Sequence, residues 1–257
     1  MERVIIKDIF SNNLKRNKRL RIILPKDYHS SKLKYQVLYM HDGQNLIDPS
    51  PYSNHSWEVI DAIDRYNSLL VVGIDHSDEF RMMEYSNYLH NSAIKHLKRM
   101  NIENIHPQAN EYGRFIVEEV KPFIDSTFRV ETDNTNTYIA GSSCGGNISL
   151  YLGLKYQDVF SCIGAFSPAY YIIKKGFYDF LDDLELNQNM KIYYDVGTEE
   201  NGFFSKIYLK EHKLFDEYIK KKLPQSQLLG VIDKGAKHSE EFWAKRFTGF
   251  VEFCLKK

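Results

Sequence analysis

The sequence predicts an α/β protein with a mostly parallel central sheet of about eight strands and helices on both faces. Short apolar segments alternate with amphipathic ones along most of the chain, which is the order of a parallel sheet connected by helices. The run Leu69 to Ile74 (LLVVGI) has no polar residue, as expected of a strand covered on both faces. No repeat, low-complexity tract or proline-rich linker divides the chain, so we expect residues 1–257 to form one domain.

The strands are predicted where apolar and β-branched residues gather between Asn, Asp, Lys and Gly residues. Three open the chain, one follows the first helix, and the rest alternate with later helices. In order, they are expected at residues 4–10, 19–24, 35–39, 69–74, 137–140, 162–166, 191–196 and 227–232.

The helices are predicted from apolar residues that recur three or four positions apart. In order, they are expected at residues 56–66, 112–124, 147–156 and 205–221, with a last one after residue 239. Pro122 should bend the second of these, because proline lacks a backbone N–H. Residues 76–110 have no regular pattern and are long for a plain loop, so we expect them to form a partial lid or a wall of a site.

Composition favours a globular protein that acts on a small molecule. Lys plus Arg and Asp plus Glu both total 34, so the formal net charge is +0 and no overall field attracts nucleic acid or an anionic membrane. No stretch is long and apolar enough to span a bilayer, and no secretion signal opens the sequence. The three cysteines are odd in number and lack a CxxC pair, which favours a reducing, cytoplasmic location.

The segment Gly141-Ser142-Ser143-Cys144-Gly145 matches the GxSxG pattern of a serine nucleophile. It lies between a predicted strand and a predicted helix, where a strained turn lifts the serine hydroxyl clear of the sheet. A side chain at position 141 or 145 should collide with the neighbouring strand or helix. Ser143 is therefore the candidate nucleophile, and the alternative is a glycine-rich turn in which it only caps a helix.

A serine nucleophile needs a histidine base, and two histidines follow Ser143. His212 lies in the charged segment LKEHKLFDEY, and we expect it to be a solvated surface residue. His238 lies between the last strand and the last helix, at the carboxyl edge of the sheet. His238 is therefore the candidate base.

The acid of such a triad should follow the preceding strand, where KIYYDVGTEEN supplies Asp195, Glu199 and Glu200. Asp195 is still within the strand, so a strand-end hydrogen bond suits it better. Spacing does not choose between the two glutamates. Their like charges disfavour joint burial, so one of them should face solvent.

An oxyanion hole needs two N–H donors for the negative oxygen of the tetrahedral intermediate. One is expected from the backbone of Cys144, next after the nucleophile. The second should come from the loop after the third strand, with the N–H of Gln44 or Gly43 as candidates. The alternative for this loop is an ordinary Asp-Gly turn, and the Cys144 thiol is expected to be a small packing group.

Several segments together resemble the putative esterase family of α/β-hydrolases, which includes enterochelin esterases, S-formylglutathione hydrolase, feruloyl esterases and mycolyltransferases. The resemblance covers nearly the whole chain. It rests on LYMHDGQNLID (38–48), Trp57, EYGRFIVEEVKPFIDSTFR (111–129), YIAGSSCGGNISLYLGLKY (138–156), AFSPAYY (165–171), YYDVGTEEN (193–201) and KGAKHSEEFWAKRF (234–247).

This resemblance implies the α/β-hydrolase fold and a catalytic triad of Ser143, Glu200 and His238. It favours Glu200 over Glu199 as the acid, and it supports Gln44 as an oxyanion donor. It also implies that Tyr85, in EYSNYLHN (84–91), and Trp57 approach the substrate. EYSNYLHN departs from the EYSPW-like pattern of relatives, so the resemblance does not fix the substrate.

The sequence therefore predicts a serine esterase that cleaves a small-molecule carboxylic ester or thioester. The serine and histidine pair supplies the proton transfers, so neither a metal nor an organic cofactor is implied. The alternatives are an acyltransferase that uses the same triad and a non-catalytic binding protein that kept the fold. The oligomeric state is left open.

Overall fold

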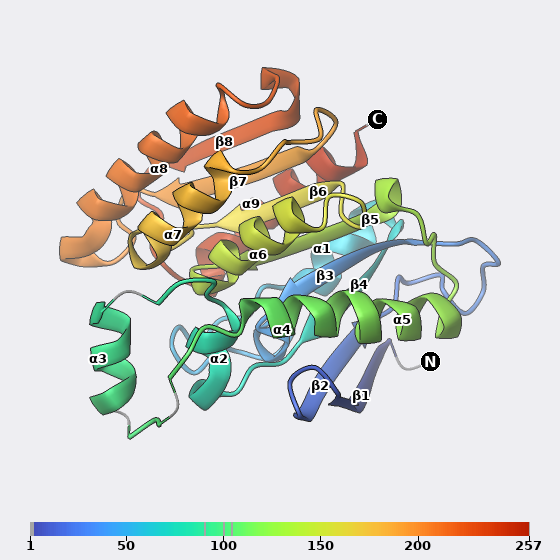
Figure 1. Ribbon diagram of the computed structural model, residues 1–257. Helices are drawn as coiled ribbons and strands as arrows, with labels where there is room; N and C mark the ends of the chain where they lie inside the picture. Colours follow the sequence, from blue (N-terminus) through green and yellow to red (C-terminus); the bar gives the residue numbers. More distant parts are fainter. Residues whose placement is uncertain (1–2, 90, 100, 104, 257) are drawn as a thin grey trace.

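The computed structural model describes residues 3–89, 91–99, 101–103 and 105–256, and these residues form one central β-sheet (Figure 1). The strands are β1 (Val4–Ser11), β2 (Arg16–Ile23), β3 (Gln36–His41), β4 (Leu69–Ile74), β5 (Thr137–Ser142), β6 (Cys162–Phe166), β7 (Lys191–Gly197) and β8 (Leu228–Asp233). Their order in the sheet is β1-β2-β4-β3-β5-β6-β7-β8. Strand β2 runs antiparallel to both neighbours, and the other pairs are parallel.

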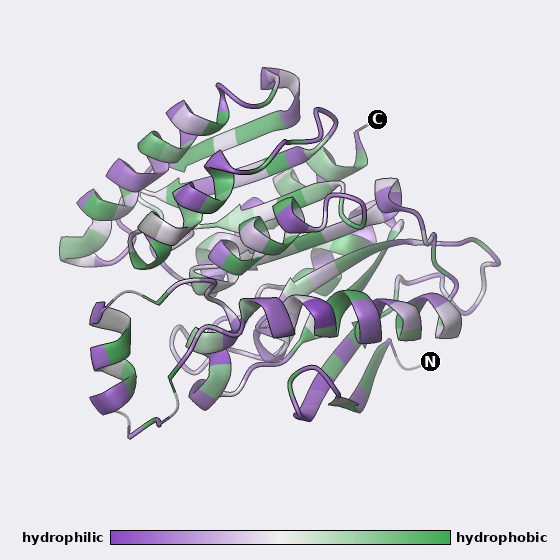
Figure 2. Ribbon diagram, in the orientation of Figure 1, coloured by the Kyte–Doolittle hydropathy of each residue, from purple (hydrophilic) through white to green (hydrophobic). Residues whose placement is uncertain are grey.

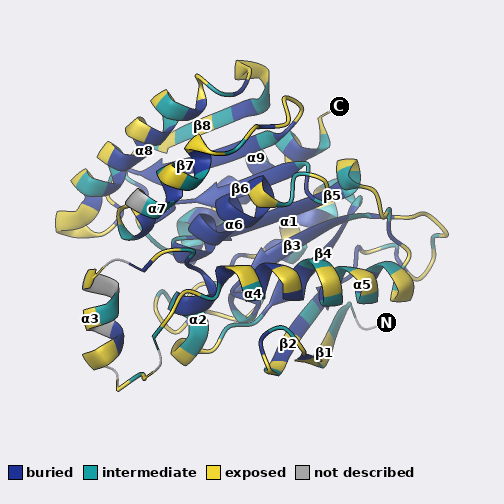
Figure 3. Ribbon diagram, viewed as in Figure 1, coloured by how far each residue is buried: buried dark blue, intermediate teal, exposed yellow. Residues whose placement is uncertain are grey.

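Helices cover both faces of the sheet. They are α1 (Val59–Tyr66), α2 (Asp78–Glu84), α3 (Asn91–Arg99), α4 (Ala109–Arg114), α5 (Lys121–Thr127), α6 (Cys144–Lys155), α7 (Tyr170–Asp182), α8 (Ser205–Ile219) and α9 (Glu240–Leu255). Helices α4 to α8 pack on one face, and α1 and α9 pack on the other. The central strands are buried between these layers, while the outer sides of the helices are exposed (Figure 3). Figure 2 shows the matching alternation of hydrophilic and hydrophobic residues along α8.

The fold prediction is confirmed, because this is the sheet of an α/β-hydrolase and its eight strands lie within three residues of their expected bounds. Helix α6 begins at Cys144, three residues before its expected start. Gly145 and Gly146 disfavour a helix by propensity, but close packing overrides that preference. A Cβ on Gly146 would lie only 3.3 Å from the carbonyl oxygens of Gly141 and Phe166.

The helix around Pro122 continues through that residue (Figure 1). A turn with the wider π spacing, Phe115–Val120, lies between α4 and α5. Pro122 follows it directly, in the first turn of α5. Proline has no backbone N–H to donate, and Pro122 lies where the regular α-helical hydrogen bonding is already interrupted, so the helix continues through it.

Helices α2, α3 and α7 were not predicted. The segment of α7 reads YYIIKKGFYDFLD, in which aromatic and β-branched residues favour a strand and Gly176 disfavours a helix. The reason for Gly176 is a long-range contact, since a Cβ there would lie 2.5 Å from Tyr88. Helices α2 and α3 share a small apolar cluster around Met83, Leu89 and Leu97, apart from the main core. Among the described residues, no helix combines the length and apolar character needed to cross a bilayer.

Candidate active site

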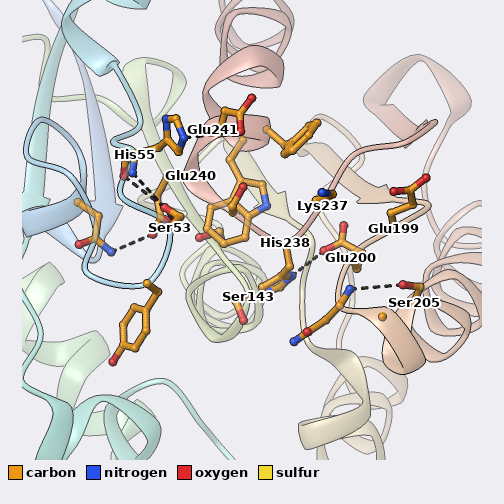
Figure 4. Close-up of a pocket in the computed structure, with 18 of the residues that line it drawn as sticks. Ser53, His55, Ser143, Glu199, Glu200, Ser205, Lys237, His238, Glu240 and Glu241 are labelled. Carbon is orange, nitrogen blue, oxygen red and sulfur yellow. Dashed lines mark hydrogen bonds and ion pairs between the residues drawn. The ribbon is translucent and has the colours of Figure 1, made fainter.

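A cavity of about 1210 Å³ opens where the parallel strands end (Figure 4). The segments that follow four strands line it. Asp42 and Asn45 follow β3, Ser143 follows β5, Glu200 follows β7 and His238 follows β8. Ligand sites of open parallel sheets form at this carboxyl edge, so the topology brings the three predicted triad residues to one place.

Ser143 occupies the sharp turn between β5 and α6. Its backbone has φ 56° and ψ −121°, a conformation that residues with a side chain rarely adopt. Hydrogen bonds to the segment after β6 help to hold the turn: the Ser143 N–H donates to the Phe166 oxygen at 2.9 Å, and the Ala169 N–H donates to the Ser143 oxygen at 3.3 Å. A strained backbone is what the sequence predicts for a turn that presents a serine nucleophile.

The two glycines of the motif differ in how tightly they are packed. A Cβ on Gly141 would lie 2.8 Å from the carbonyl carbon and oxygen of Gly145, so the backbone would have to move. A Cβ on Gly145 would lie 3.4 Å from its nearest neighbours, Asp42 and His41, which is ordinary contact. The predicted collision is therefore present at Gly141 and absent at Gly145.

We expect Gly141→Ala to lower the free energy of unfolding by roughly 1–3 kcal/mol, because the added methyl group meets fixed backbone. Gly249→Ala is the matched control. Gly249 lies within α9 with nothing within 4 Å of a Cβ, so alanine should be neutral or should stabilise by up to about 1 kcal/mol. Urea unfolding of both variants measures the difference. Equal midpoints would contradict the tight packing of the turn.

His238 and Glu200 are joined by two hydrogen bonds. The Nδ1 atom of His238 lies 2.6 Å from Glu200 Oε2, and the His238 N–H donates to the Glu200 backbone oxygen at 2.8 Å. The imidazole is also packed between Tyr208 and Trp243, with both ring centroids 5.0 Å away. Because Nδ1 is occupied by the carboxylate, Nε2 is the ring nitrogen left for other partners.

The structure distinguishes the two glutamates that the spacing left open. Glu200 is only 3% exposed, whereas Glu199 is exposed, as expected for like charges in sequence. Burial alone would raise the pKa of Glu200. The hydrogen bond and charge of His238, with donors from Ser167 and Gly197, nevertheless hold that pKa below its usual value. Glu200 is therefore a buried carboxylate that stays ionised beside His238.

Ser143 and His238 line the same cavity and are drawn next to each other in Figure 4. Between these two described residues there is no direct hydrogen bond. Hydrogen bonds between a nucleophile and its base are often long without substrate and shorten when substrate binds. Ser143 and His238 therefore lie in one cavity, but the hydrogen bond between them is not formed.

The predicted oxyanion donors lie on two neighbouring segments. Cys144 is the first residue of α6, where backbone N–H groups have no acceptor within the helix. Gly43 and Gln44 belong to a short 3₁₀ turn, Gly43–Asn45, directly after β3. The side-chain amide of Gln44 lies 3.2 Å from His76 Nε2, which can accept from it, so the backbone N–H of Gln44 is the candidate donor for an oxyanion. The oxyanion role of these residues stays a prediction.

Sequence reasoning missed an ion pair beside this loop. Arg81 donates to both carboxylate oxygens of Asp42, at 2.8 and 2.7 Å, and His76 Nδ1 lies 2.7 Å from the same carboxylate. Burial would raise the pKa of Asp42, but the Arg81 charge and the His76 hydrogen bond hold it well below its usual value. All three residues line the cavity. His76 and Arg81 come from residues 76–110, of which residues 90, 100 and 104 lie outside the described residues.

The two predicted substrate contacts do not reach this cavity. Trp57 is 2% exposed and stacks on Trp243 with ring centroids 5.7 Å apart, within the core. Tyr85 is 1% exposed, and its hydroxyl accepts a hydrogen bond from the Asp42 N–H. Neither side chain lines the cavity, so both support the site from behind.

The expectation that His212 is a solvated surface residue is wrong. It is 3% exposed and packs against Tyr194, with ring centroids 5.3 Å apart. Tyr208 and Phe215, four residues before it and three after, are buried on the same face of α8. That helical spacing was the signal that could have identified His212 as buried.

A buried polar group behind Glu200 also escaped the sequence analysis. It consists of Ser167, Asp195, Trp243 and Arg246. The segment AFSPAYY contains Ser167 and formed part of the family resemblance, but it carried no assigned role. Asp195 behaves as the sequence suggested, since it accepts hydrogen bonds at the end of its strand from the Ser167 N–H and the Tyr193 hydroxyl, both at 2.8 Å.

The chain matches a known protein family over most of its length. The model of the family described as "putative esterase" matches residues 11–253. The uncharacterized protein YbbA of Bacillus subtilis (strain 168) is 24% identical over 248 residues, which cover 94% of each protein.

Solved structures share the fold at low sequence identity. The BES protein from Bacillus cereus superimposes with a TM-score of 0.76 at 16% identity, covering 100% of this chain and 96% of that one. The enterobactin esterase FES from Shigella flexneri, solved in the presence of enterobactin, gives a TM-score of 0.71 at 16% identity. That comparison covers 97% of this chain but only 58% of FES.

Proposed function

Because the chain belongs to the putative esterase family and is an ester-hydrolysing enzyme, we propose that it cleaves carboxylic esters through an acyl intermediate on Ser143. His238 would act as the base through Nε2, and Glu200 would hold the imidazole in the required tautomer. The backbone N–H groups of Cys144 and Gln44 would stabilise the negative oxygen of the intermediate.

The proposed reaction uses these groups in two halves. Ser143 attacks the ester carbonyl while His238 accepts its proton, and His238 then gives that proton to the departing alcohol. Water then attacks the acyl carbon while His238 takes its proton, and His238 returns that proton to Ser143 Oγ as the bond to the acyl group breaks and the acid leaves. Glu200 stabilises the imidazolium in both halves of the reaction.

One observation carries the proposal: the 2.6 Å contact between His238 Nδ1 and the buried carboxylate of Glu200, in the cavity that Ser143 lines. Cys144 does not compete as the nucleophile, because burial raises the pKa of its thiol and keeps it protonated.

The substrate we propose is a bulky small-molecule ester. The cavity of about 1210 Å³ exceeds the 300–1,000 Å³ that is typical of small-molecule sites. The FES structure was solved with enterobactin, and a siderophore ester is therefore a useful test compound, together with thioesters and acetylated sugars.

We also propose that residues 1–257 form one domain, that 76–110 walls the site, and that the protein is cytoplasmic. The family match to residues 11–253 and the single sheet of the described residues support the first point. The cavity contacts of His76 and Arg81 support the second.

The test is turnover of p-nitrophenyl esters of increasing acyl length, alongside a siderophore ester. We expect a burst of p-nitrophenol equal to the enzyme concentration when deacylation is slow, and an acyl group on Ser143 in acid-quenched protein. Added glycerol distinguishes a transferase, because acylglycerol would then replace free acid as the main product. Absence of turnover from correctly folded protein would favour a binding protein instead.

A further inference from the structure

We propose that Ser167 is a positioning residue for Glu200, and that Trp243 and Arg246 force its hydroxyl to donate to the Glu200 carboxylate. The inference rests on the proposed function, in which Glu200 is the acid of the triad. Ser167 directly follows β6 and is fully buried. It does not line the cavity, so its side chain would act on catalysis through Glu200.

The direction of the Ser167 hydrogen bond follows from its partners. Its Oγ lies 3.0 Å from Trp243 Nε1 and 3.2 Å from Arg246 Nη2, and both groups can only donate. A hydroxyl has two acceptor lone pairs, and these two donors occupy them. The single hydroxyl hydrogen is left for Glu200 Oε1, which lies 2.6 Å away.

The two donors are themselves fixed, so the hydroxyl cannot turn to another arrangement. Arg246 is 8% exposed, its Nε lies 2.8 Å from Asp195 Oδ2, and its Nη1 lies 3.2 Å from Asp233 Oδ2. Trp243 is 5% exposed and stacked on Trp57.

The two carboxylate oxygens of Glu200 have different partners. Oε1 accepts from the Ser167 hydroxyl and from the Gly197 N–H, whereas Oε2 faces His238 Nδ1. Figure 4 shows the Glu200 carboxylate extended toward His238. A carboxylate anchored through one oxygen cannot rotate away, so the other oxygen stays aligned with the imidazole. The same donors favour the ionised form of Glu200.

The backbone of Ser167 is strained into this position. Its φ of 42° lies in the left-handed region. Its N–H donates to the buried Asp195 carboxylate at 2.8 Å, which holds it there. Residues that are held in a strained conformation by their neighbours tend to occur at functional sites. Here the hydroxyl of the strained residue points toward Glu200.

Ser167→Gly tests this role, because glycine adopts the positive φ without strain and the variant should therefore fold. We expect kcat to fall about 10- to 100-fold, as for other small displacements of a catalytic group, with KM within twofold of wild type. Ser11→Ala is the matched control. Ser11 is also fully buried, and its hydroxyl donates to the carboxylate of Glu119 at 3.4 Å, but on β1, away from the cavity. Its kcat should stay within twofold of wild type.

A double-mutant cycle shows whether Ser167 acts through Glu200. In the Glu200→Gln background, Ser167→Gly should change kcat less than threefold, because the carboxylate it positions is already gone. An equal loss in both backgrounds would overturn the inference, as would a Ser167→Gly enzyme within threefold of wild type. Failure of the proposed function would give a different result, because Glu200→Gln alone would then keep full activity. Glu200 would not be the acid of the triad, and Ser167 could not act through it.

Discussion

Ser143→Ala is expected to lower kcat on the order of 10⁶-fold, which is the cost of removing the nucleophile from a serine triad. The neighbouring thiol of Cys144 should not replace the Ser143 hydroxyl as the nucleophile, because burial raises the pKa of that thiol. Steady-state hydrolysis of a p-nitrophenyl ester measures the loss. The thermal midpoint should not change, because alanine occupies the same strained turn as serine.

A fluorophosphonate probe gives an independent measurement of the same residue. We expect one adduct per chain in the wild-type protein, on Ser143, and none in Ser143→Ala. Ser142→Ala is the control, since Ser142 is the adjacent serine, lines the same cavity and ends β5. That variant should keep the adduct. Labelling that survives in Ser143→Ala and disappears in Ser142→Ala would move the nucleophile by one residue.

The parts of this protein that the sequence predicts well are those specified by local patterns. The run LLVVGI is uniformly apolar, and β4 occupies those residues with every one of them buried. The GSSCG segment follows a strand, and Ser143 has the strained backbone that this context predicts. Both features depend on residues close together in the chain, where periodicity and glycine placement carry the information.

The parts that escaped prediction depend on contacts between distant residues. Ser167, Asp195 and Arg246 meet behind Glu200 from the turn after β6, from β7 and from α9, and nothing near any one of them in sequence reveals the others. From the sequence alone, Gly176 indicates the end of a helix. In the structure it lies within α7, where a Cβ would collide with Tyr88. His212 is different, because its burial was readable from helical spacing and the charged residues around it obscured that signal.

The choice between Glu199 and Glu200 combines both kinds of information. Spacing along the chain left them equal, and the family resemblance favoured Glu200. In the structure Glu200 is buried against His238, while Glu199 is exposed at the cavity rim. A pair of matched substitutions can therefore test the acid directly.

Glu200→Gln is expected to lower kcat by about 10⁴-fold. The cause would be a change in the tautomer of His238, because the size of the side chain at position 200 stays the same. The Ser167 hydroxyl and the Gly197 N–H both donate toward the Oε1 position, so the amide oxygen of the new glutamine should occupy it. The amide NH₂ must then face Nδ1 of His238. Nδ1 can only accept from it, so the ring proton moves to Nε2, and Nε2 can no longer take the proton of Ser143.

Glu199→Gln changes the same charge at the adjacent position and should alter kcat less than about fivefold, because an exposed charge is well solvated. Both variants keep the volume of the side chain, so neither should unfold the protein. If Glu199→Gln lost activity and Glu200→Gln kept it, the acid would be Glu199. If both kept it, the histidine would work without a buried carboxylate, although its Nδ1 lies 2.6 Å from one.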